Sequence, residues 1–155
     1  MTDWLRWALL PAACVHIFEE FVFPGGFSAW YRTYRAVPSK ITPRFLVIVN
    51  VALVIVCLNV GLVGRNPVGV PFWLAISALL SANGLWHGWA SYKSRGYSPG
   101  TITGLMIYVP LAVYGYAKIL GSGAVSVWTA LVAFAVGTSY QVWSAAYHNR
   151  GVRKA

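Results

Sequence analysis

The chain has 155 residues, of which 58% are hydrophobic and 10% are charged, and its formal net charge is +9. A soluble domain carries about 25% charged residues, so the composition excludes an ordinary soluble domain and indicates an integral membrane protein. The basic residues stand singly or in pairs between long apolar runs. Membrane topology and anionic lipid explain that arrangement better than nucleic-acid binding does, so we expect no nucleic-acid partner.

The apolar runs predict an all-α fold, an integral membrane helical bundle that forms a single transmembrane domain over residues 1-155. About twenty residues of helix are enough to cross the hydrocarbon core of a bilayer. Five such spans are expected, and the alternative is four spans preceded by a re-entrant or interfacial first segment. The predicted spans are residues 4-23, 45-63, 70-92, 101-120 and 125-147.

The first connector carries a stripe of aromatic residues. Phe27, Trp30, Tyr31 and Tyr34 are spaced at i, i+3, i+4 and i+7, with arginines off the stripe. That periodicity predicts a short interfacial helix over residues 27-37 that lies on the membrane surface. A connector that is merely rich in aromatic residues is the alternative.

The basic residues also indicate an orientation. With five spans, the first and third connectors and the C-terminal tail share one side and hold nine of the twelve basic residues. The positive-inside rule then places the N-terminus outside and the C-terminus in the cytoplasm, as expected for a bacterial inner-membrane protein. The lipid bilayer is therefore an expected partner, and assembly into a homo-oligomer is left open.

Three acidic residues occur in the chain, and two of them, Glu19 and Glu20, lie close to His16 within the first predicted span. A carboxylate in an apolar segment is costly unless it is paired, protonated or bound to a metal. On a helix, His16 shares a face with Glu19 at i+3 and with Glu20 at i+4. We therefore expect these three residues to form one wall of a site.

The three histidines converge in the predicted topology, because each lies near the cytoplasmic end of the first, third or fifth span. Imidazole and carboxylate ligands suit catalytic zinc or non-haem iron, so we predict a metal site with zinc preferred over iron. A buried ion-pair network that fixes helix packing is the alternative. For His148, an interfacial position beside Arg150 is an equal alternative. The candidate metal ligands are His16, Glu19, Glu20, His87 and His148.

Further polar residues fall at the same membrane depth and predict a cavity inside the bundle. Asn83 lies one helical turn before His87, and the small pair Gly84 and Gly88 would let another helix approach closely. Taken singly, Asn50, Asn59 and Tyr108 are better explained by packing than by a role in a site. The candidate catalytic residues are His16, Glu19, Glu20 and Tyr108. The candidate substrate-contacting or supporting residues are Asn50, Asn83, Trp86, Gln141 and Ser144.

Three motifs in the chain resemble those of a known family. They are His16-x-x-Glu19-Glu20 near the N-terminus, Asn83-x-x-x-His87 in mid-chain and Tyr97-x-Pro99-Gly100 just after it. Together they resemble the HXXEE-domain family of small prokaryotic membrane proteins over most of the chain. The resemblance implies the polytopic fold and marks the histidines and glutamates of the first two motifs as signature positions. It implies no particular activity.

These observations predict a membrane-embedded, metal-dependent enzyme that acts on a small apolar or lipid-like substrate near the cytoplasmic side. The metal would activate water or oxygen, and a spare glutamate would transfer protons. One alternative is a metal-free acid-base isomerase or cyclase of the sterol-isomerase kind, in which a buried neutral glutamate donates a proton. Another is a transporter or binding protein for a metal or protons, although the chain shows no internal repeat.

Overall fold

The structure, a computed structural model, is helical in every regular element that it describes. It describes residues 2–23, 25–35, 42–64 and 66–149, and the side chains of all of these except 35 and 145–149. In chain order the helices are α1 (Asp3–Trp7), α2 (Leu9–Val22), α3 (Phe27–Arg35), α4 (Pro43–Val63), α5 (Gly69–Ser94), α6 (Thr101–Thr103), the π-helix η1 (Gly104–Tyr108), α7 (Val109–Gly121) and α8 (Val127–Asn149).

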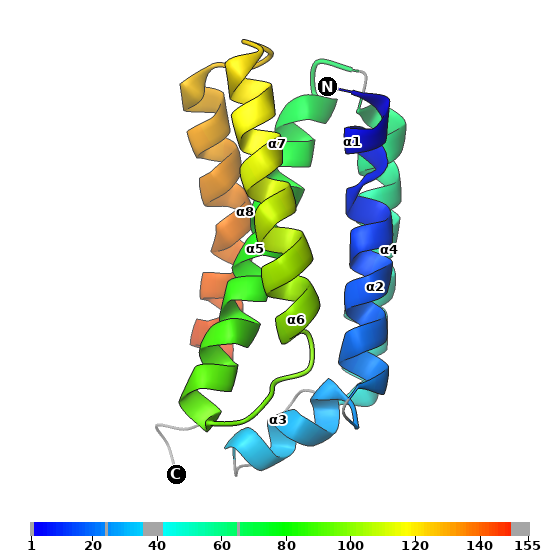
Figure 1. The fold of residues 1–155 in the computed structure, drawn as a ribbon, viewed down its shortest axis with the longest axis vertical. Helices are drawn as coiled ribbons and strands as arrows, with labels where there is room; N and C mark the ends of the chain where they lie inside the picture. Colours follow the sequence, from blue (N-terminus) through cyan, green and yellow to red (C-terminus); the bar gives the residue numbers. More distant parts are fainter. Residues whose placement is uncertain (1, 24, 36–41, 65, 150–155) are drawn as a thin grey trace.

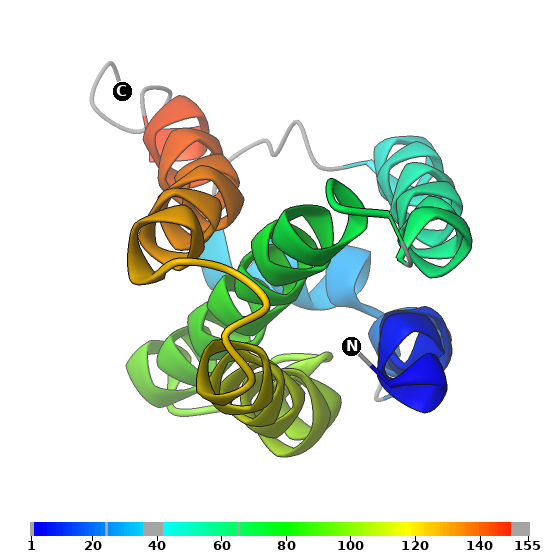
Figure 2. The same cartoon turned by 90° about the horizontal axis from the view of Figure 1, so that it is seen from above.

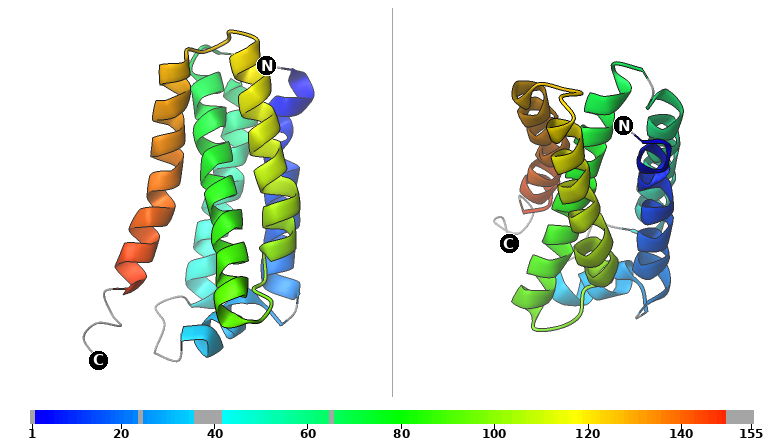
Figure 3. Two further views of the ribbon diagram at one scale, coloured as in Figure 1. Left: turned by 60° about the vertical axis from the view of Figure 1, so that its left-hand side comes forward. Right: turned by 45° about the horizontal axis from the view of Figure 1, so that its top comes forward.

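The long helices pack lengthwise into a bundle. Figure 1 shows α2, α4, α5, α7 and α8 running along the longest axis, with α3 lying across one end. In the view from above, α5 occupies the centre, and α4, α7 and α8 surround it (Figure 2). Figure 3 shows from two further directions that α2 runs beside α4, with which it is in contact. Helix α5 thus contacts α4, α7 and α8 from one central position.

Two prolines account for two interruptions of helical register. Pro11 has no N–H to donate to the carbonyl of Trp7, and α1 ends at Trp7. Pro110 likewise cannot bond to the carbonyl of Met106, which lies inside η1. A π-helical turn shifts the register of a helix locally and often occurs at functional sites. Here it lies in the helix that carries Tyr108.

Close contact between α5 and η1 depends on glycine, as the sequence predicted. A Cβ atom on Gly84 would lie 2.5 Å from the carbonyl oxygen of Gly104, and one on Gly88 would lie 3.1 Å from the Leu105 side chain. Contacts that short exclude larger residues at Gly84. The small residues therefore let α5 and η1 pack against each other, which brings the α5 histidine close to the start of α6.

Within the described ranges, three helical segments are long and apolar enough to cross a membrane, namely α4, α5 and the continuous run Thr101–Gly121. A fourth arises if Asp3–Val22 and Phe27–Tyr34, which meet at a bend of 59°, are counted as one broken span. The fold is thus a helical bundle consistent with a membrane protein. Five spans stay a prediction, because α8 covers the last expected span but is not among these candidates over the described residues.

Candidate functional site

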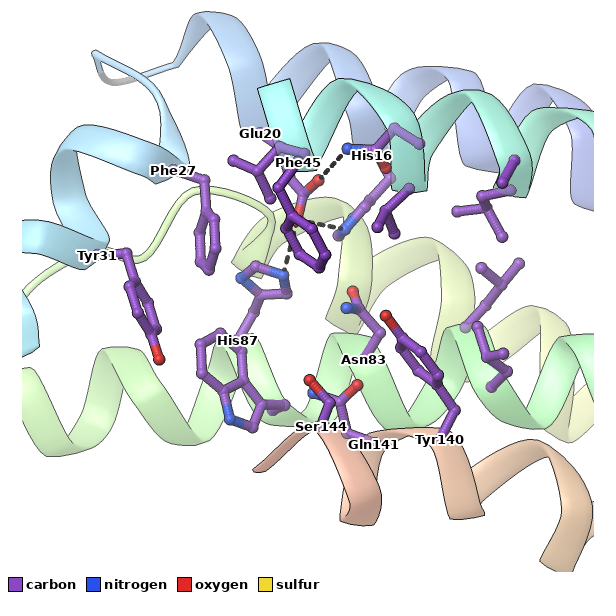
Figure 4. Close-up of a pocket in the computed structure, with 18 of the residues that line it drawn as sticks. His16, Glu20, Phe27, Tyr31, Phe45, Asn83, His87, Tyr140, Gln141 and Ser144 are labelled. Atoms are coloured by element: carbon purple, nitrogen blue, oxygen red, sulfur yellow. Dashed lines mark hydrogen bonds and ion pairs between the residues drawn. The ribbon is translucent and has the colours of Figure 1, made fainter. Parts of the chain in front are cut away.

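The buried carboxylate of Glu20 lies between two histidines. Its Oε1 is 3.1 Å from Nε2 of His87 and 3.6 Å from Nε2 of His16. The three residues are 7%, 1% and 2% exposed, respectively. One helical turn of α2 places His16 and Glu20 on a common face, and α5 presents His87 opposite them. The structure thus brings together three of the predicted site residues (Figure 4).

Each imidazole is also held at its other nitrogen by a hydroxyl group. Nδ1 of His16 lies 2.8 Å from Oγ1 of Thr103, and Nδ1 of His87 lies 3.2 Å from Oγ of Ser98. With Nδ1 engaged, both Nε2 atoms point toward Glu20. Histidines that bind metals usually engage their second nitrogen in this way, because that hydrogen bond fixes the orientation of the ring.

One nitrogen in this group lacks a hydrogen-bond partner. Nε2 of His16 is buried and has none among the described residues, since its distance of 3.6 Å from Glu20 exceeds that of a hydrogen bond. An unsatisfied buried polar atom costs about 1–3 kcal/mol. One ligand atom from each of His16, Glu20 and His87 lies within 4.8 Å of the other two, so a single metal ion could contact all three.

Glu19 occupies a different environment from its neighbour. Its Oε1 accepts the N–H groups of Gly100 at 3.0 Å and Ile102 at 3.1 Å, and its Oε2 accepts the N–H of Thr103 at 2.8 Å. The hydroxyls of Thr103 and Tyr97 donate to the same carboxylate. Glu19 therefore caps the N-terminus of α6, where helical N–H groups lack partners within the helix. It stands outside the group formed by His16, Glu20 and His87.

The loop between α5 and α6 closes over the two histidines. Gly100 has a φ of +96°, which glycine adopts at little cost. A Cβ at this position would lie 2.9 Å from Cε1 of His16 and 2.9 Å from Cε1 of His87. Both the backbone conformation and the contact therefore require glycine at this position.

Several residues around the histidines were missed by sequence reasoning. Ser98 and Thr103 were not proposed as site residues, and Tyr97 and Gly100 were noted only as motif positions. The signal that could have identified the loop was the third motif, since it lies directly before the helix that follows. The hydroxyl groups carried no such signal, because Ser and Thr are common near helix N-termini.

Tyr97 lies in that loop, outside the helices that are long enough to cross a membrane. Its hydroxyl donates to Glu19. Partial burial, together with the adjacent Glu19 carboxylate, raises the pKa of Tyr97 to about 12. The hydroxyl is therefore protonated at neutral pH and keeps its role as a donor.

Three other predicted residues lie close to the group of three. Asn50 donates from Nδ2 to Oε2 of Glu20 at 3.3 Å. The ring of Tyr108 packs against His16 with 4.5 Å between centroids. Oδ1 of Asn83 and the Tyr108 hydroxyl are both buried without a hydrogen-bond partner in the described part of the chain. Asn83 also lines the adjoining cavity, so its amide can contact a bound molecule.

A cavity of about 720 Å³ adjoins the three residues. His16, Glu20 and His87 line it together with apolar side chains of α4 and α5 and aromatic side chains of α3. Figure 4 shows Phe27 and Tyr31 on the α3 side. Ligand pockets are commonly about 300–1,000 Å³ and mostly apolar with a few polar groups, as this one is. Its lining also includes the predicted residues Asn50, Asn83, Trp86, Gln141 and Ser144.

His148 lies within α8, but its side chain falls outside the described residues. Its predicted role as a metal ligand therefore stays a prediction. Among the described residues, the group of three takes its ligand atoms from α2 and α5.

Comparison with protein families matches residues 7–115 to a family described as "Protein of unknown function with HXXEE motif". Comparisons with curated proteins and with solved structures found no match. The matched region covers most of the chain and includes the site residues His16, Glu20 and His87 together with the loop that closes over them. The chain therefore belongs to the HXXEE family, as its three motifs indicated.

Proposed function

We propose that this protein is a membrane-embedded enzyme that binds a metal ion, zinc in preference to iron, through His16, Glu20 and His87. Its substrate is a small apolar or lipid-like molecule that occupies the adjoining cavity. One observation carries the proposal: two imidazole nitrogens and a carboxylate oxygen converge within 4.8 Å at the polar part of a largely apolar cavity.

The donor set supports a catalytic ion more than a structural one. Structural zinc sites are closed by four protein ligands, whereas catalytic sites combine three protein ligands with an open position. Two histidines and one carboxylate also suit non-haem iron. When bound, such an ion lowers the pKa of a coordinated water and polarises a carbonyl or phosphoryl oxygen. Asn50 orients the carboxylate, because it holds Oε2 of Glu20 while Oε1 faces the histidines.

The cavity walls support an apolar substrate. Phe45 and Ile48 line the cavity from α4 and are also 40% and 59% exposed, so the cavity reaches the surface of the bundle beside α4. In a bilayer that surface faces lipid. A lipid-like molecule can then enter from the membrane without passing through water, and the polar groups at His16 and Glu20 would meet its head group.

The proposed membrane arrangement has five spans, with α1 and α2 forming a broken first span and α8 the fifth. The lengthwise packing of these helices supports it (Figure 1). The distribution of basic residues supports an N-terminus outside and a C-terminus in the cytoplasm of a bacterial inner membrane. Helix α3, with its aromatic residues, would then lie along the cytoplasmic surface near the site.

Metal analysis of the purified full chain tests the metal site. After loading with zinc or iron and removal of excess metal, the wild-type protein should retain about one ion per chain, as expected for one three-ligand site. His16→Ala and Glu20→Ala should abolish retention while circular dichroism shows unchanged helix content. Asn59→Ala is the matched control, because Asn59 donates to the Ile55 carbonyl within α4 and is not part of the cavity lining. Equal retention by all four proteins would overturn the metal assignment.

Incubation with a membrane lipid extract tests the enzymatic part of the proposal. Mass spectrometry should reveal at least one lipid species that the metal-loaded wild-type protein converts and the Glu20→Ala variant does not. If the wild-type protein binds its metal but changes no species, the protein is a metal-binding protein and the enzyme assignment is wrong.

A metal-free acid-base isomerase or cyclase is the second candidate, and one observation favours it. Oε1 of Glu20 is already within hydrogen-bond distance of His87 Nε2, so the two groups can share a proton without a metal. The ring of Tyr108 packs against the neighbouring His16, and aromatic faces stabilise developing positive charge. Conversion that survives exhaustive chelation would favour this candidate over the metal enzyme.

A further inference from the structure

The hydrogen bonds of Glu19 show that it is ionised. Five donors reach its two oxygens, three of them backbone N–H groups and two of them hydroxyls. Backbone N–H groups can only donate, and they occupy Oε1 twice and Oε2 once. Several N–H donors on one carboxyl group at the N-terminus of a helix favour its charged form. The side chain is therefore a carboxylate that only accepts.

This carboxylate determines the direction of the next hydrogen bond. Thr103 has a single hydroxyl hydrogen, which it donates to Oε2 of Glu19. The same oxygen, Oγ1, lies 2.8 Å from Nδ1 of His16. Because its hydrogen is already directed to the carboxylate, Oγ1 can only accept from His16. Nδ1 of His16 must therefore carry a hydrogen.

We propose that Glu19 is a positioning residue that acts through Thr103 to fix His16 in the Nδ1-protonated tautomer. In that tautomer Nε2 has a lone pair and no hydrogen, which is the form that binds a metal. The claim about metal affinity rests on the function proposed above. The tautomer itself is a property of the metal-free protein and can be measured without any metal.

The geometry at Glu20 agrees with this assignment. Nε2 of His16 has no hydrogen-bond partner among the described residues and stays 3.6 Å from Glu20, as two facing acceptors should. Nε2 of His87 lies 3.1 Å from the same oxygen, a distance at which it donates a hydrogen. The two histidines thus differ: Nε2 of His16 is free of hydrogen, whereas the hydrogen on Nε2 of His87 would have to move to Nδ1, beside Ser98, before Nε2 could bind a metal.

Thr103 is a better residue to change than Glu19, which accepts from three backbone N–H groups and two hydroxyl groups. Replacing Glu19 would also remove the cap of α6, whereas Thr103→Val keeps the backbone N–H bond and the shape of the side chain. Thr103→Ser restores the hydroxyl and serves as the matched control. Nitrogen-15 NMR of histidine-labelled, metal-free protein at pH 8 reads the tautomer, and the His16→Gln variant assigns the signal.

In the wild-type protein and in Thr103→Ser, His16 should show a protonated Nδ1 and an unprotonated Nε2. In Thr103→Val, Nδ1 loses its acceptor, so the hydrogen should move to Nε2, where it can be donated to Glu20. Zinc affinity should then fall about 10–100-fold, as for other residues that orient metal-binding histidines. Thr103→Ser should keep wild-type affinity.

Two results would overturn the inference. One is a wild-type His16 that carries its hydrogen on Nε2 or on both nitrogens. The other is a Thr103→Val variant with an unchanged tautomer. Neither result depends on metal binding, so a failure of the tautomer assignment is distinguishable from a wild-type protein that binds no zinc, which would instead contradict the proposed metal site.

Discussion

The N–H of Thr103 donates to Oε2 of Glu19 at 2.8 Å, although the two residues lie 84 positions apart in the chain. This bond joins α2 to the start of α6 and belongs to a set of five that converge on one buried carboxylate. The adjacent residue Glu20 makes none of these bonds and faces the histidines instead. Glu19 therefore stabilises the fold, whereas the neighbouring Glu20 lines the site.

Replacement of Glu19 by alanine should destabilise the protein strongly. The change removes the cap of α6 and leaves buried N–H groups without acceptors, so the free energy of unfolding should fall by about 2 kcal/mol or more. Unfolding in detergent, followed by tryptophan fluorescence, measures the loss. Glu20→Gln keeps the shape and the Asn50 contact and should cost less than about 1 kcal/mol. Equal destabilisation by both changes would contradict these separate roles of the two glutamates.

Gly100→Ala should displace both imidazole rings. The added Cβ would lie 2.9 Å from Cε1 of each histidine, and the φ of +96° disfavours alanine. We expect zinc affinity to fall by about tenfold or more, as when the support of metal-binding histidines is lost. Gly123→Ala is the control for backbone strain, because Gly123 has a φ of +68° with nothing within 4 Å of its Cβ position. If both variants bind zinc equally well, the loop does not hold the rings.

Tyr97 should make stability depend on alkaline pH. Its pKa is raised to about 12 in the folded protein, by partial burial and by the bond to Glu19. It is about 10 in an unfolded chain. A group whose pKa is raised on folding contributes stability that is fully present below its unfolded pKa, so this contribution should be lost between about pH 10 and pH 12. Comparison of unfolding midpoints across this range tests the effect.

Tyr97→Phe should be less stable than the wild-type protein at pH 8, and the difference should vanish as the pH approaches 12. Tyr92→Phe is the control, because Tyr92 is exposed at 79% near the end of α5. A Tyr97→Phe variant that keeps wild-type stability at pH 8 would show that the bond to Glu19 contributes nothing.

A larger side chain in the cavity should prevent substrate binding without changing metal binding. Ala52 lines the cavity from α4, so Ala52→Phe would place a ring inside it. Native mass spectrometry should then show fewer lipid molecules retained by the protein, while the zinc content stays unchanged. Val51→Phe is the control, because Val51 is 54% exposed on α4 and does not line the cavity. Equal lipid retention by both variants would contradict the assigned substrate cavity.

The convergence of His16, Glu20 and His87 could be predicted because it follows from regular features. Helical spacing fixes which residues share a face, and alternating helix directions place the C-terminal ends of α2 and α5 at the same end of the bundle (Figure 1). The same reasoning placed Glu19 in the site, since i+3 and i+4 are equally close to a histidine on a helix. Only the docking of a loop 81 residues away, where the Gly100 N–H meets its carboxylate, separates Glu19 from Glu20.

The break between α1 and α2 and the π-turn η1 show a second limit of sequence reasoning. Pro11 and Pro110 each remove one helical hydrogen bond, but a proline within a helix produces a kink, a break or a π-turn depending on its neighbours. The hydroxyl partners of the histidines were likewise out of reach, because their role depends on the rotamer and on where the loop packs. In the sequence, Thr103 is an ordinary residue near a helix N-terminus. Only the structure shows that it contacts His16.

Anomalous diffraction from crystals of the zinc-loaded full chain, recorded at the zinc absorption edge, tests the metal site most directly. We expect one peak at about 2.0–2.2 Å from Nε2 of His16, Nε2 of His87 and a carboxylate oxygen of Glu20, with Glu19 outside the coordination sphere. A fully zinc-loaded protein with no peak between these three residues, or with its peak on other ligands, would contradict this expectation.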